Sequence, residues 1–292
     1  MKAPRKTLPY LLILPAMTGI VLFVLYPMVS LIQQSFYKVN PMNASKNKFI
    51  GLENYQKMFQ TSAFQKALIN TGYYTFFSVI LILAVSLLLS VWLAGRRSRF
   101  HSFIQGCVFL PHVISMVSIG LIFQQMMDPD FGIFNQILQA LGLPACTWLR
   151  SSSTAVGSII FTNVWKSVGY YTLILIAAIQ SIPESIYEAA SLDNSGSIRT
   201  FFRITLPMIS PQIFFALIVL TIGSFKIFDM IFIMTGGGPN NASTSLVFYI
   251  YAKVFQEFDI GKAAAAGVIL MILVGIMTIL YFAGLSRKVH YQ

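Results

Sequence analysis

Long apolar runs alternate with short polar segments along this chain of 292 residues. A helix needs about 20 mostly apolar residues to cross a bilayer, because each residue adds a rise of about 1.5 Å. Six runs reach that length, and only the fourth and fifth contain Asp, Glu, Lys or Arg. The predicted spans are 8–36, 71–94, 103–127, 154–182, 207–234 and 263–285. The pattern predicts an all-α integral membrane protein with six transmembrane helices in one domain, 1–292.

The basic residues predict the orientation of these spans. Ten of the 20 lie before span one, between spans two and three, between four and five, or after span six. They are Lys2, Arg5, Lys6, Arg96, Arg97, Arg99, Arg199, Arg203, Arg287 and Lys288. Cytoplasmic loops carry an excess of Lys and Arg. Both termini are therefore predicted to be cytoplasmic, although five lysines in 37–70 weaken the contrast with the outer loops.

The composition agrees with a membrane protein. Hydrophobic residues make up 56% of the chain and charged residues 10%, with a mean hydropathy of +0.73. Soluble domains carry roughly 25% charged residues. A net charge of +11 could indicate nucleic acid binding, but the basic residues are spread over the segments between spans. We therefore expect no nucleic acid partner.

The segment 49–68, between spans one and two, combines apolar and polar residues. It includes Phe49, Leu52, Met58, Phe59 and Phe64. This spacing predicts a short amphipathic helix at the membrane surface. A plain structural connector is the alternative.

The inner loop 183–206, between spans four and five, has the signals of a helix-turn-helix. Ser181 and Glu184 form a capping-box pattern. The run 193–196 predicts a turn, since Asp, Asn and Gly favour turn backbone. Ser197 is expected to cap a second short helix. Ala189 and Ala190 are small enough to let another surface approach closely.

The same loop resembles the EAA motif of ABC importer permeases. Eight positions agree in one ungapped window: Glu188, Ala189, Ala190, Asp193, Phe201, Ile204, Leu206 and Pro207. The sequence departs from the motif at Asn194 and Ser195, where the family usually has Gly and Ala. Asn is the best non-glycine residue for left-handed backbone, so the turn is expected to survive.

Other segments extend the resemblance over most of the chain. The stretches 49–55, 128–135 and 235–239 are similar to outer loops of carbohydrate permeases of the maltose and glycerol-phosphate type. The resemblance implies an ATP-driven, binding-protein-dependent sugar importer in the bacterial plasma membrane, the inner membrane of the cell. This chain would form half of its translocation pore.

The resemblance also implies partners and roles. A second permease subunit, two ATP-binding cassette subunits and an extracytoplasmic solute-binding protein would complete the transporter. ATP and magnesium would bind to the partner ATPase, so we expect no cofactor, no metal site and no catalytic residue in this chain. The residues implied in ATPase coupling are Glu188, Ala189, Ala190, Asp193, Asn194 and Gly196. Glu188 is the expected charged contact, with a solvated helix charge as the alternative.

Ionisable residues inside spans are candidates for a solute pathway. Lys226 and Asp229 are three residues apart and are expected to pair on one helical face. Together with Lys166, these two residues could line a sugar pocket that aromatic side chains flank. Alternatively, the three residues could form ion pairs that hold spans four and five together. The pathway candidates are Trp165, Lys166, Tyr170, Phe225, Lys226 and Asp229. The sequence does not indicate which solute is transported, or whether this subunit or its partner permease binds it.

Two local features complete the expectations. Pro111 and His112 predict a break in span three. His112 is expected to be a packing residue that forms hydrogen bonds, with a proton-carrying group as the alternative. The run 237–240, Gly-Gly-Pro-Asn, is expected either to contact the solute-binding protein or to form a plain turn.

Two other classes of protein fit the sequence less well. An ion-driven secondary transporter predicts charges deep in several spans and an internal repeat, whereas only two spans carry Asp, Glu, Lys or Arg. A membrane enzyme predicts a recognisable catalytic motif, such as a phosphate-binding loop or a nucleophile elbow, and the sequence contains neither.

Overall fold

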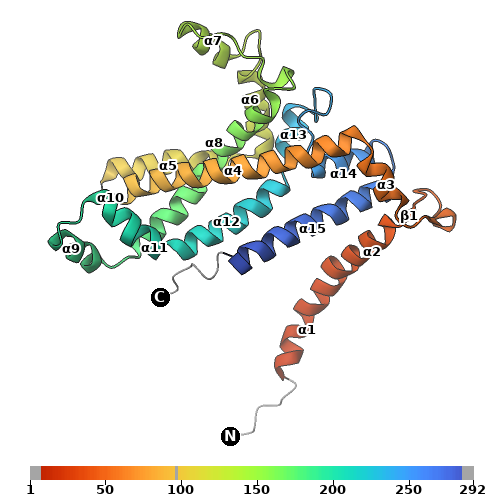
Figure 1. The fold of residues 1–292 in the computed structure, drawn as a ribbon, viewed down its shortest axis with the longest axis horizontal. Helices are drawn as coiled ribbons and strands as arrows, with labels where there is room; N and C mark the ends of the chain where they lie inside the picture. The colour runs from red at the N-terminus through yellow and green to blue at the C-terminus, as the bar shows by residue number, and fades with distance from the viewer. Residues whose placement is uncertain (1–7, 96–97, 285–292) are drawn as a thin grey trace. The chain divides into compact units, whose positions relative to one another are not determined.

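The computed structural model describes residues 8–95 and 98–284, which fall into two compact units. The first unit combines the chain up to Phe64 with 249–272, and the second combines 65–248 with the chain from Leu273 onward. Apart from one short hairpin, the regular elements of the described residues are all helices (Figure 1). The predicted all-α fold class is confirmed.

The first unit contains a long N-terminal helix, a hairpin and a short helix. Its elements are α1 (Leu8–Ile20), a π-helical turn (Val21–Leu25), α2 (Tyr26–Ser35), β1 (Tyr37–Lys38), a 3-10 turn (Ala44–Lys46), β2 (Lys48–Phe49) and α3 (Glu53–Phe59). The two strands pair antiparallel. Asn54 on α3 fastens the end of α2, because its side-chain amide donates to the backbone oxygens of Ser35 and Tyr37 at 2.8 and 3.0 Å.

The second unit holds most of the helices. They are α4 (Ser62–Ala94), α5 (Arg99–Val113), α6 (Met116–Met126), α7 (Ile133–Ala140), α8 (Ala155–Gln180), α9 (Glu184–Leu192), α10 (Ser197–Thr200), α11 (Leu206–Met208), α12 (Ser210–Phe225) and α13 (Asp229–Met234). A 3-10 turn (Trp148–Arg150) precedes α8, and a π-helical turn (Phe201–Thr205) joins α10 to α11. Two further helices, α14 (Leu246–Phe255) and α15 (Ile260–Gly284), contribute residues to both units.

The described residues contain five helices long and apolar enough to cross a membrane, or six if one bent pair counts as a span. The five are Tyr10–Ser35, Ser62–Ala94, Ala155–Gln180, Ser210–Met234 and Ile260–Gly284. Predicted spans one, two, four, five and six each correspond to one of them. The basic residues at 2, 5, 6, 96, 97, 287 and 288, on which the orientation depends, lie outside the described residues.

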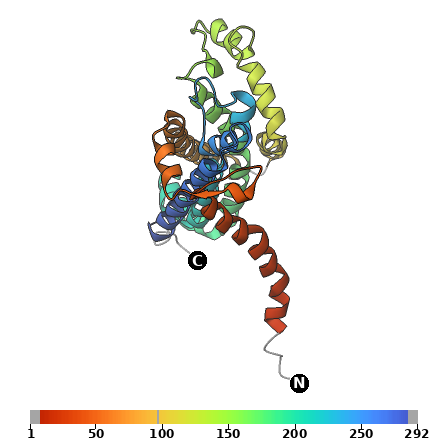
Figure 2. The same ribbon diagram turned by 90° about the vertical axis from the view of Figure 1, so that its right-hand side faces the viewer.

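The third predicted span, 103–127, is not a single straight helix. Its two halves, α5 and α6, bend by 98° at a break after Val113 (Figure 1 and Figure 2). The predicted break is confirmed, although Pro111 lies inside α5 and the helix ends two residues later. Ile114 and Ser115 take extended backbone between the halves, with ψ values of 142° and 136°.

The amphipathic helix predicted over 49–68 is two elements. The first is α3, and α4 begins at Ser62, nine residues before the predicted start of span two. Thr61 separates them: its backbone N–H and its hydroxyl both donate to the carbonyl oxygen of Met58, at 3.0 and 2.7 Å. These bonds satisfy a carbonyl at the end of α3, and no helix-breaking residue then separates Ser62 from the apolar run.

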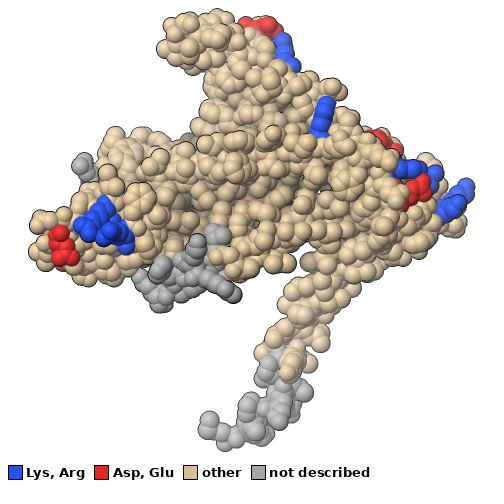
Figure 3. Space-filling view, viewed as in Figure 1, with Lys and Arg blue, Asp and Glu red and all other residues tan. Residues whose placement is uncertain are grey.

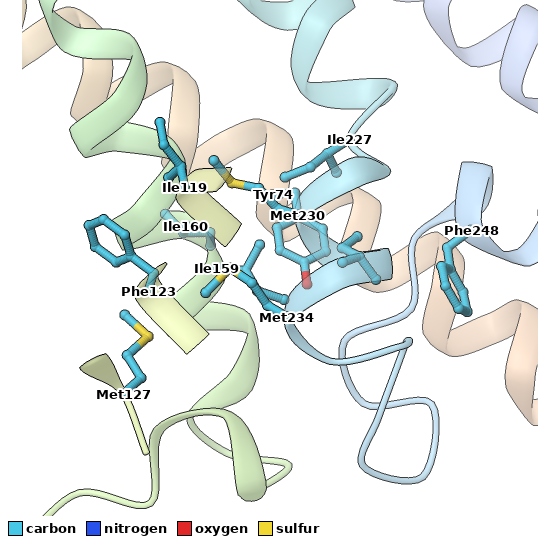
Figure 4. Close-up of a cluster of buried hydrophobic side chains, with 11 residues drawn as sticks. Tyr74, Ile119, Phe123, Met127, Ile159, Ile160, Ile227, Met230, Met234 and Phe248 are labelled. Carbon is cyan, nitrogen blue, oxygen red and sulfur yellow. The ribbon is translucent and has the colours of Figure 1, made fainter. Parts of the chain in front are cut away.

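A buried apolar cluster holds α4, α6, α8 and α13 together in the second unit (Figure 4). Its members are Tyr74, Ile119, Phe123, Met127, Ile159, Ile160, Ile227, Met230, Ile231, Met234 and Phe248. Lipid tails are as apolar as these side chains, so close packing rather than removal from water stabilises such a cluster in a membrane. Ile227 of the cluster lies in the break between α12 and α13, so the cluster packs around this break.

Candidate functional site

The loop 183–206 folds as predicted into two helices separated by a turn. On α9 the side chains of Glu188 and Ala189 are exposed, whereas Ala190 is buried. Figure 3 shows acidic and basic side chains together at this end of the molecule, next to a surface that is mostly uncharged. The loop therefore presents a charged and a small residue outward, next to a small residue packed inward.

The predicted capping box of α9 is wrong. The Ser181 hydroxyl donates to the Ala178 carbonyl at 2.7 Å, so it closes α8 and does not cap α9. The helix instead begins after Pro183, without a side-chain cap. Ser197 also does not act as a cap, because it is the first residue of α10 and Gly196 precedes it in extended backbone. Pro183 itself occupies the N-cap position, with a non-helical ψ of 133°.

The turn after α9 is a complete Schellman motif. Asn194 has a φ of 52°, in the left-handed region. The Asn194 N–H donates to Ser191 O at 3.1 Å, and the Ser195 N–H donates to Ala190 O at 3.0 Å. These are the two bonds that define the motif. Asn194 thus takes the place of the usual glycine with the same backbone geometry, as predicted.

Substitutions at Asn194 should change how firmly this turn is held. A β-branched residue in left-handed backbone is disfavoured by about 1–2 kcal/mol. We expect Asn194→Val to speed hydrogen exchange of the Ser195 amide by about tenfold, whereas Asn194→Gly should keep its protection. Exchange measured by mass spectrometry on the extracted chain tests this. Equal protection in both variants would mean that the left-handed residue does not limit the turn.

The helix-turn-helix is attached to the membrane helices on its inner side. The hydroxyls of Tyr187 and Thr205 are 3.1 Å apart and join α9 to the π-helical turn. Ile182 and Ile209 belong to a buried cluster with Ala178 of α8. Packed contacts therefore connect α9 both to α8 and to the segment that enters α12.

A second candidate site is a cavity of about 490 Å³ where two helices are interrupted. Its polar and aromatic lining residues are His112, Asn163, Ser167, Tyr170, Tyr171, Ser224, Lys226, Phe228 and Asp229. The ends of α5, α6, α12 and α13 all reach this cavity, through His112, Met116, Lys226 and Asp229. Interrupted helices at membrane depth are tolerated where they line a cavity or are buried in protein.

Three of the six predicted pathway residues line this cavity: Tyr170, Lys226 and Asp229. Tyr170 stacks on the His112 ring, with centroids 4.5 Å apart and an interplanar angle of 14°. Asn163 donates to the Ser78 hydroxyl at 3.2 Å, which orients its amide. His112 thus packs against Tyr170, as expected, and it is also part of the cavity lining.

The predicted pairing of Lys226 with Asp229 is wrong. Lys226 lies just past the end of α12 and Asp229 begins α13, so no common helical face exists. Both side chains are exposed, and the ion pairs found among the described residues do not include them. Prediction by helical spacing failed because it assumed an unbroken helix through 226–228.

Lys166 does not face the cavity but supports the break in span three. Its ammonium group donates to the backbone oxygens of His112 and Ile114 at 3.0 Å and of Pro111 at 3.4 Å. The side chain is 8% exposed. A cation at the C-terminal end of a helix also interacts favourably with the helix dipole. Lys166 therefore caps the end of α5 and does not form the expected ion pair.

The remaining two pathway candidates lie elsewhere. Trp165 is 43% exposed, and its ring contacts Phe123 with centroids 5.0 Å apart. Phe225 is buried on α12, on the side that faces Tyr281 of α15. Sequence reasoning missed Asn163, Ser167 and Ser224, because hydroxyl and amide residues in an apolar run give no signal of which face they occupy.

The loop that follows α13, residues 235–245, is hydrogen-bonded to α4. Asn70 donates to the backbone oxygens of Ala242 and Thr244 at 2.8 and 3.1 Å. The Tyr74 hydroxyl donates to Ser243 O at 2.9 Å. The tip of the loop is formed by Asn240 and Asn241, both exposed and both at positive φ. These hydrogen bonds connect both sides of the turn to α4.

The segment 128–150, between α6 and α8, is held together by ion pairs and hydrogen bonds. Arg150 forms ion pairs with Asp128 at 3.0 Å and with Asp130 at 2.8 Å. Backbone N–H groups of Asp130 and Phe131, together with Arg150, hold the pKa of Asp128 below its usual range. The Asn135 side chain bonds to Pro129, Cys146 and Trp148. These contacts make 128–150 a compact element outside the spans.

Comparisons with known proteins agree with one another. The family described as "binding-protein-dependent transport system inner membrane component" matches residues 86–291. The probable ABC transporter permease protein YurN of Bacillus subtilis is 38% identical, with 92% of each chain covered. The sn-glycerol-3-phosphate transport system permease protein UgpA of Yersinia pestis is 34% identical over 98% of this chain and 96% of its own.

Relatives and solved structures extend this picture. The arabinooligosaccharides transport system permease protein AraP of Halalkalibacterium halodurans is 31% identical, over 97% of this chain and 90% of its own. A crystal structure of a bacterial ABC transporter involved in the import of the acidic polysaccharide alginate has a chain that is 26% identical, with a TM-score of 0.84. That alignment covers 97% of this chain and 96% of the other.

Proposed function

Because this chain belongs to the family of binding-protein-dependent transport system inner membrane components, we propose that it is the permease subunit of a sugar importer that couples to its ATPase through α9. The whole chain, 1–292, is one permease domain in this proposal. The resemblance predicted from the EAA motif is confirmed by the family match and by the relatives. Family membership gives no support to the alternative of an ion-driven secondary transporter.

The observation that carries the coupling role is the geometry of α9. Glu188 and Ala189 point outward from a helix whose end is fixed by the Schellman turn. The Tyr187–Thr205 contact joins that helix to the run that enters α12. An ATPase surface that binds Glu188, Ala189, Asp193, Asn194 and Gly196 would move both membrane helices when it moves. Ala190, which was expected to contact the ATPase, is buried and instead packs inward.

The proposed partners follow from the same membership. A second permease subunit completes the pore, two ATP-binding cassette subunits bind ATP and magnesium, and an extracytoplasmic binding protein delivers the solute. A solved complex similar in fold contains a pentasaccharide-bound periplasmic protein. The rigid tip at Asn240 and Asn241 is the proposed contact for the binding protein of this transporter. In this proposal both termini lie in the cytoplasm of a bacterium.

The cavity between the helix breaks is the proposed solute pathway. Its hydroxyl, amide and charged groups can bond to sugar hydroxyls, and Tyr170, Tyr171 and Phe228 offer flat apolar faces. Relatives named for glycerol 3-phosphate and for arabinooligosaccharides support a carbohydrate or a polyol phosphate as the solute.

Uptake into cells tests the proposed function. Radiolabelled glycerol 3-phosphate and an arabinooligosaccharide are offered to cells with and without this chain, its ATPase and its binding protein. We expect uptake of one solute class to require all three components. Uptake that continues without the ATPase or without the binding protein would contradict the proposal.

Glu188→Lys tests the coupling role within that transporter. The variant places a positive charge where a carboxylate is proposed to meet the ATPase. We expect several-fold less ATPase to co-purify and a similar loss of ATP-driven uptake, beyond the ~0–1 kcal/mol of an exposed ion pair because like charges then repel. Co-purification on an affinity-tagged chain and an uptake assay are the measurements.

Glu184→Lys is the matched control for that change. Glu184 lies one turn earlier on α9 and faces a hollow between α9 and the membrane helices, together with Tyr187 and Ser191. The same change in charge there should leave ATPase binding nearly intact. If both variants lose the ATPase equally, the effect is one of net charge and Glu188 has no specific role.

A further inference from the structure

Two arginines and two large apolar residues share one exposed face just before α12. Arg199 and Arg203 are both exposed, and Ile198 and Phe202 are 77% and 61% exposed. With Gly196 and Ser197 they line an open hollow of about 610 Å³. Figure 3 shows basic side chains gathered over the α10 end of the molecule. Nothing in the coupling role requires an apolar and basic stripe on this face.

The charges on this face are not neutralised within the chain. The ion pairs found among residues 8–95 and 98–284 leave both Arg199 and Arg203 without a carboxylate partner. The acidic residues of the same loop, Glu184, Glu188 and Asp193, lie on α9 or at its end rather than in the hollow. The hollow is thus a positively charged site that an anion can enter.

The backbone places this face at the edge of a membrane span. The segment runs from α10 through the π-helical turn and α11, and α12 starts at Ser210. Arg203 precedes Ser210 by seven residues, which is about 10 Å along a helix. Arginine side chains near helix ends extend to the lipid headgroups, while neighbouring apolar side chains enter the acyl region.

We propose that this face binds the headgroup of an anionic phospholipid, with Arg199 and Arg203 on the phosphate and with Ile198 and Phe202 against the acyl chains. Guanidinium groups suit phosphate because they donate in a planar fork. The pairing of two basic with two apolar residues on one face fits a lipid better than an acidic protein surface, which would leave Phe202 and Ile198 uncovered. The lipid would fix the height of the coupling loop at the membrane surface.

Lipid retention measured on the full chain tests the proposal. The tagged chain is purified from nanodiscs of phosphatidylcholine with phosphatidylglycerol, and bound lipid is counted by native mass spectrometry. We expect the unmodified chain to enrich phosphatidylglycerol, and Arg199→Gln with Arg203→Gln to lower that enrichment by about fivefold for each arginine. The control is Lys46→Gln with Lys48→Gln, two exposed lysines in the first outer loop whose loss should leave the enrichment unchanged.

A second measurement needs no substitution. Phosphatidylglycerol with a photoreactive acyl chain should cross-link to peptides that contain Ile198 or Phe202, and high salt should reduce the yield. Unchanged enrichment in the arginine variant, or cross-links confined to other segments, would overturn the proposal. Loss of the ATPase from the arginine variant with lipid retention unchanged would also overturn it, because the occupant would then be the ATPase.

Discussion

Gly169→Ala should strongly destabilise the native fold of this chain. A Cβ at Gly169 on α8 would lie 1.9 Å from the backbone oxygen of Val108 and 2.9 Å from the Cα of Phe109 on α5. Both atoms belong to the backbone, so no side-chain rotation relieves the clash. Overpacking commonly costs about 1–3 kcal/mol even where side chains can yield, and we expect about 3 kcal/mol or more here. The measurement is the thermal unfolding midpoint of the detergent-extracted chain.

Gly157→Ala provides the matched control on the same helix. A Cβ at Gly157 meets no atom within 4 Å. Alanine also has a better helix propensity than glycine, by about 1 kcal/mol. We expect this variant to be as stable as the unmodified chain or slightly more stable. If both variants unfold at the same temperature, α5 and α8 do not pack as closely as the structure shows.

Lys166→Met should release the break between α5 and α6. The substitution keeps the length of the side chain but removes three bonds to the carbonyl oxygens of Pro111, His112 and Ile114. Hydrogen bonds to a charged group contribute about 1.5–3 kcal/mol each, and carbonyls left unpaired in an apolar site are costly. We expect a loss of about 3–5 kcal/mol, measured as a lower unfolding temperature and faster proteolysis near residue 114.

Lys226→Met is the control that shows whether the loss of stability in Lys166→Met comes only from removing a charge. Lys226 is also a lysine at a helix end within the membrane region, but it is exposed to the cavity rather than bonded to a broken helix. Its substitution should change solute uptake and leave the unfolding temperature nearly unchanged. A loss of stability as large as that of Lys166→Met would contradict the capping role assigned to Lys166.

Several features could be predicted from the sequence because their causes are local. Hydropathy is a property of consecutive residues, so the spans and the all-α class were predictable from the runs themselves. The left-handed turn at Asn194 was also predictable, since the preference of Asn for that backbone depends on its own side chain. The EAA resemblance uses residues close in sequence and led to the correct family.

Predictions failed where partners came from distant segments. Lys166 was assigned to the pathway, but its bonding partners lie more than 50 residues away, on α5 and just after it. Lys226 and Asp229 were paired on the assumption of a continuous helix, which the break at 226–228 removes. The predicted capping box at Ser181 was wrong because its hydroxyl bonds to the Ala178 carbonyl at the end of α8.

The sequence by itself therefore determined that this chain crosses a membrane several times and carries a helix-turn-helix of the importer family. Only the tertiary structure decided where the helices break, which charges support a break and which ones line a cavity. The reason is physical. Insertion into a bilayer depends on the sum of side-chain hydrophobicities over one segment, whereas the partner of a buried lysine depends on which backbone carbonyls other helices bring within about 3 Å of it.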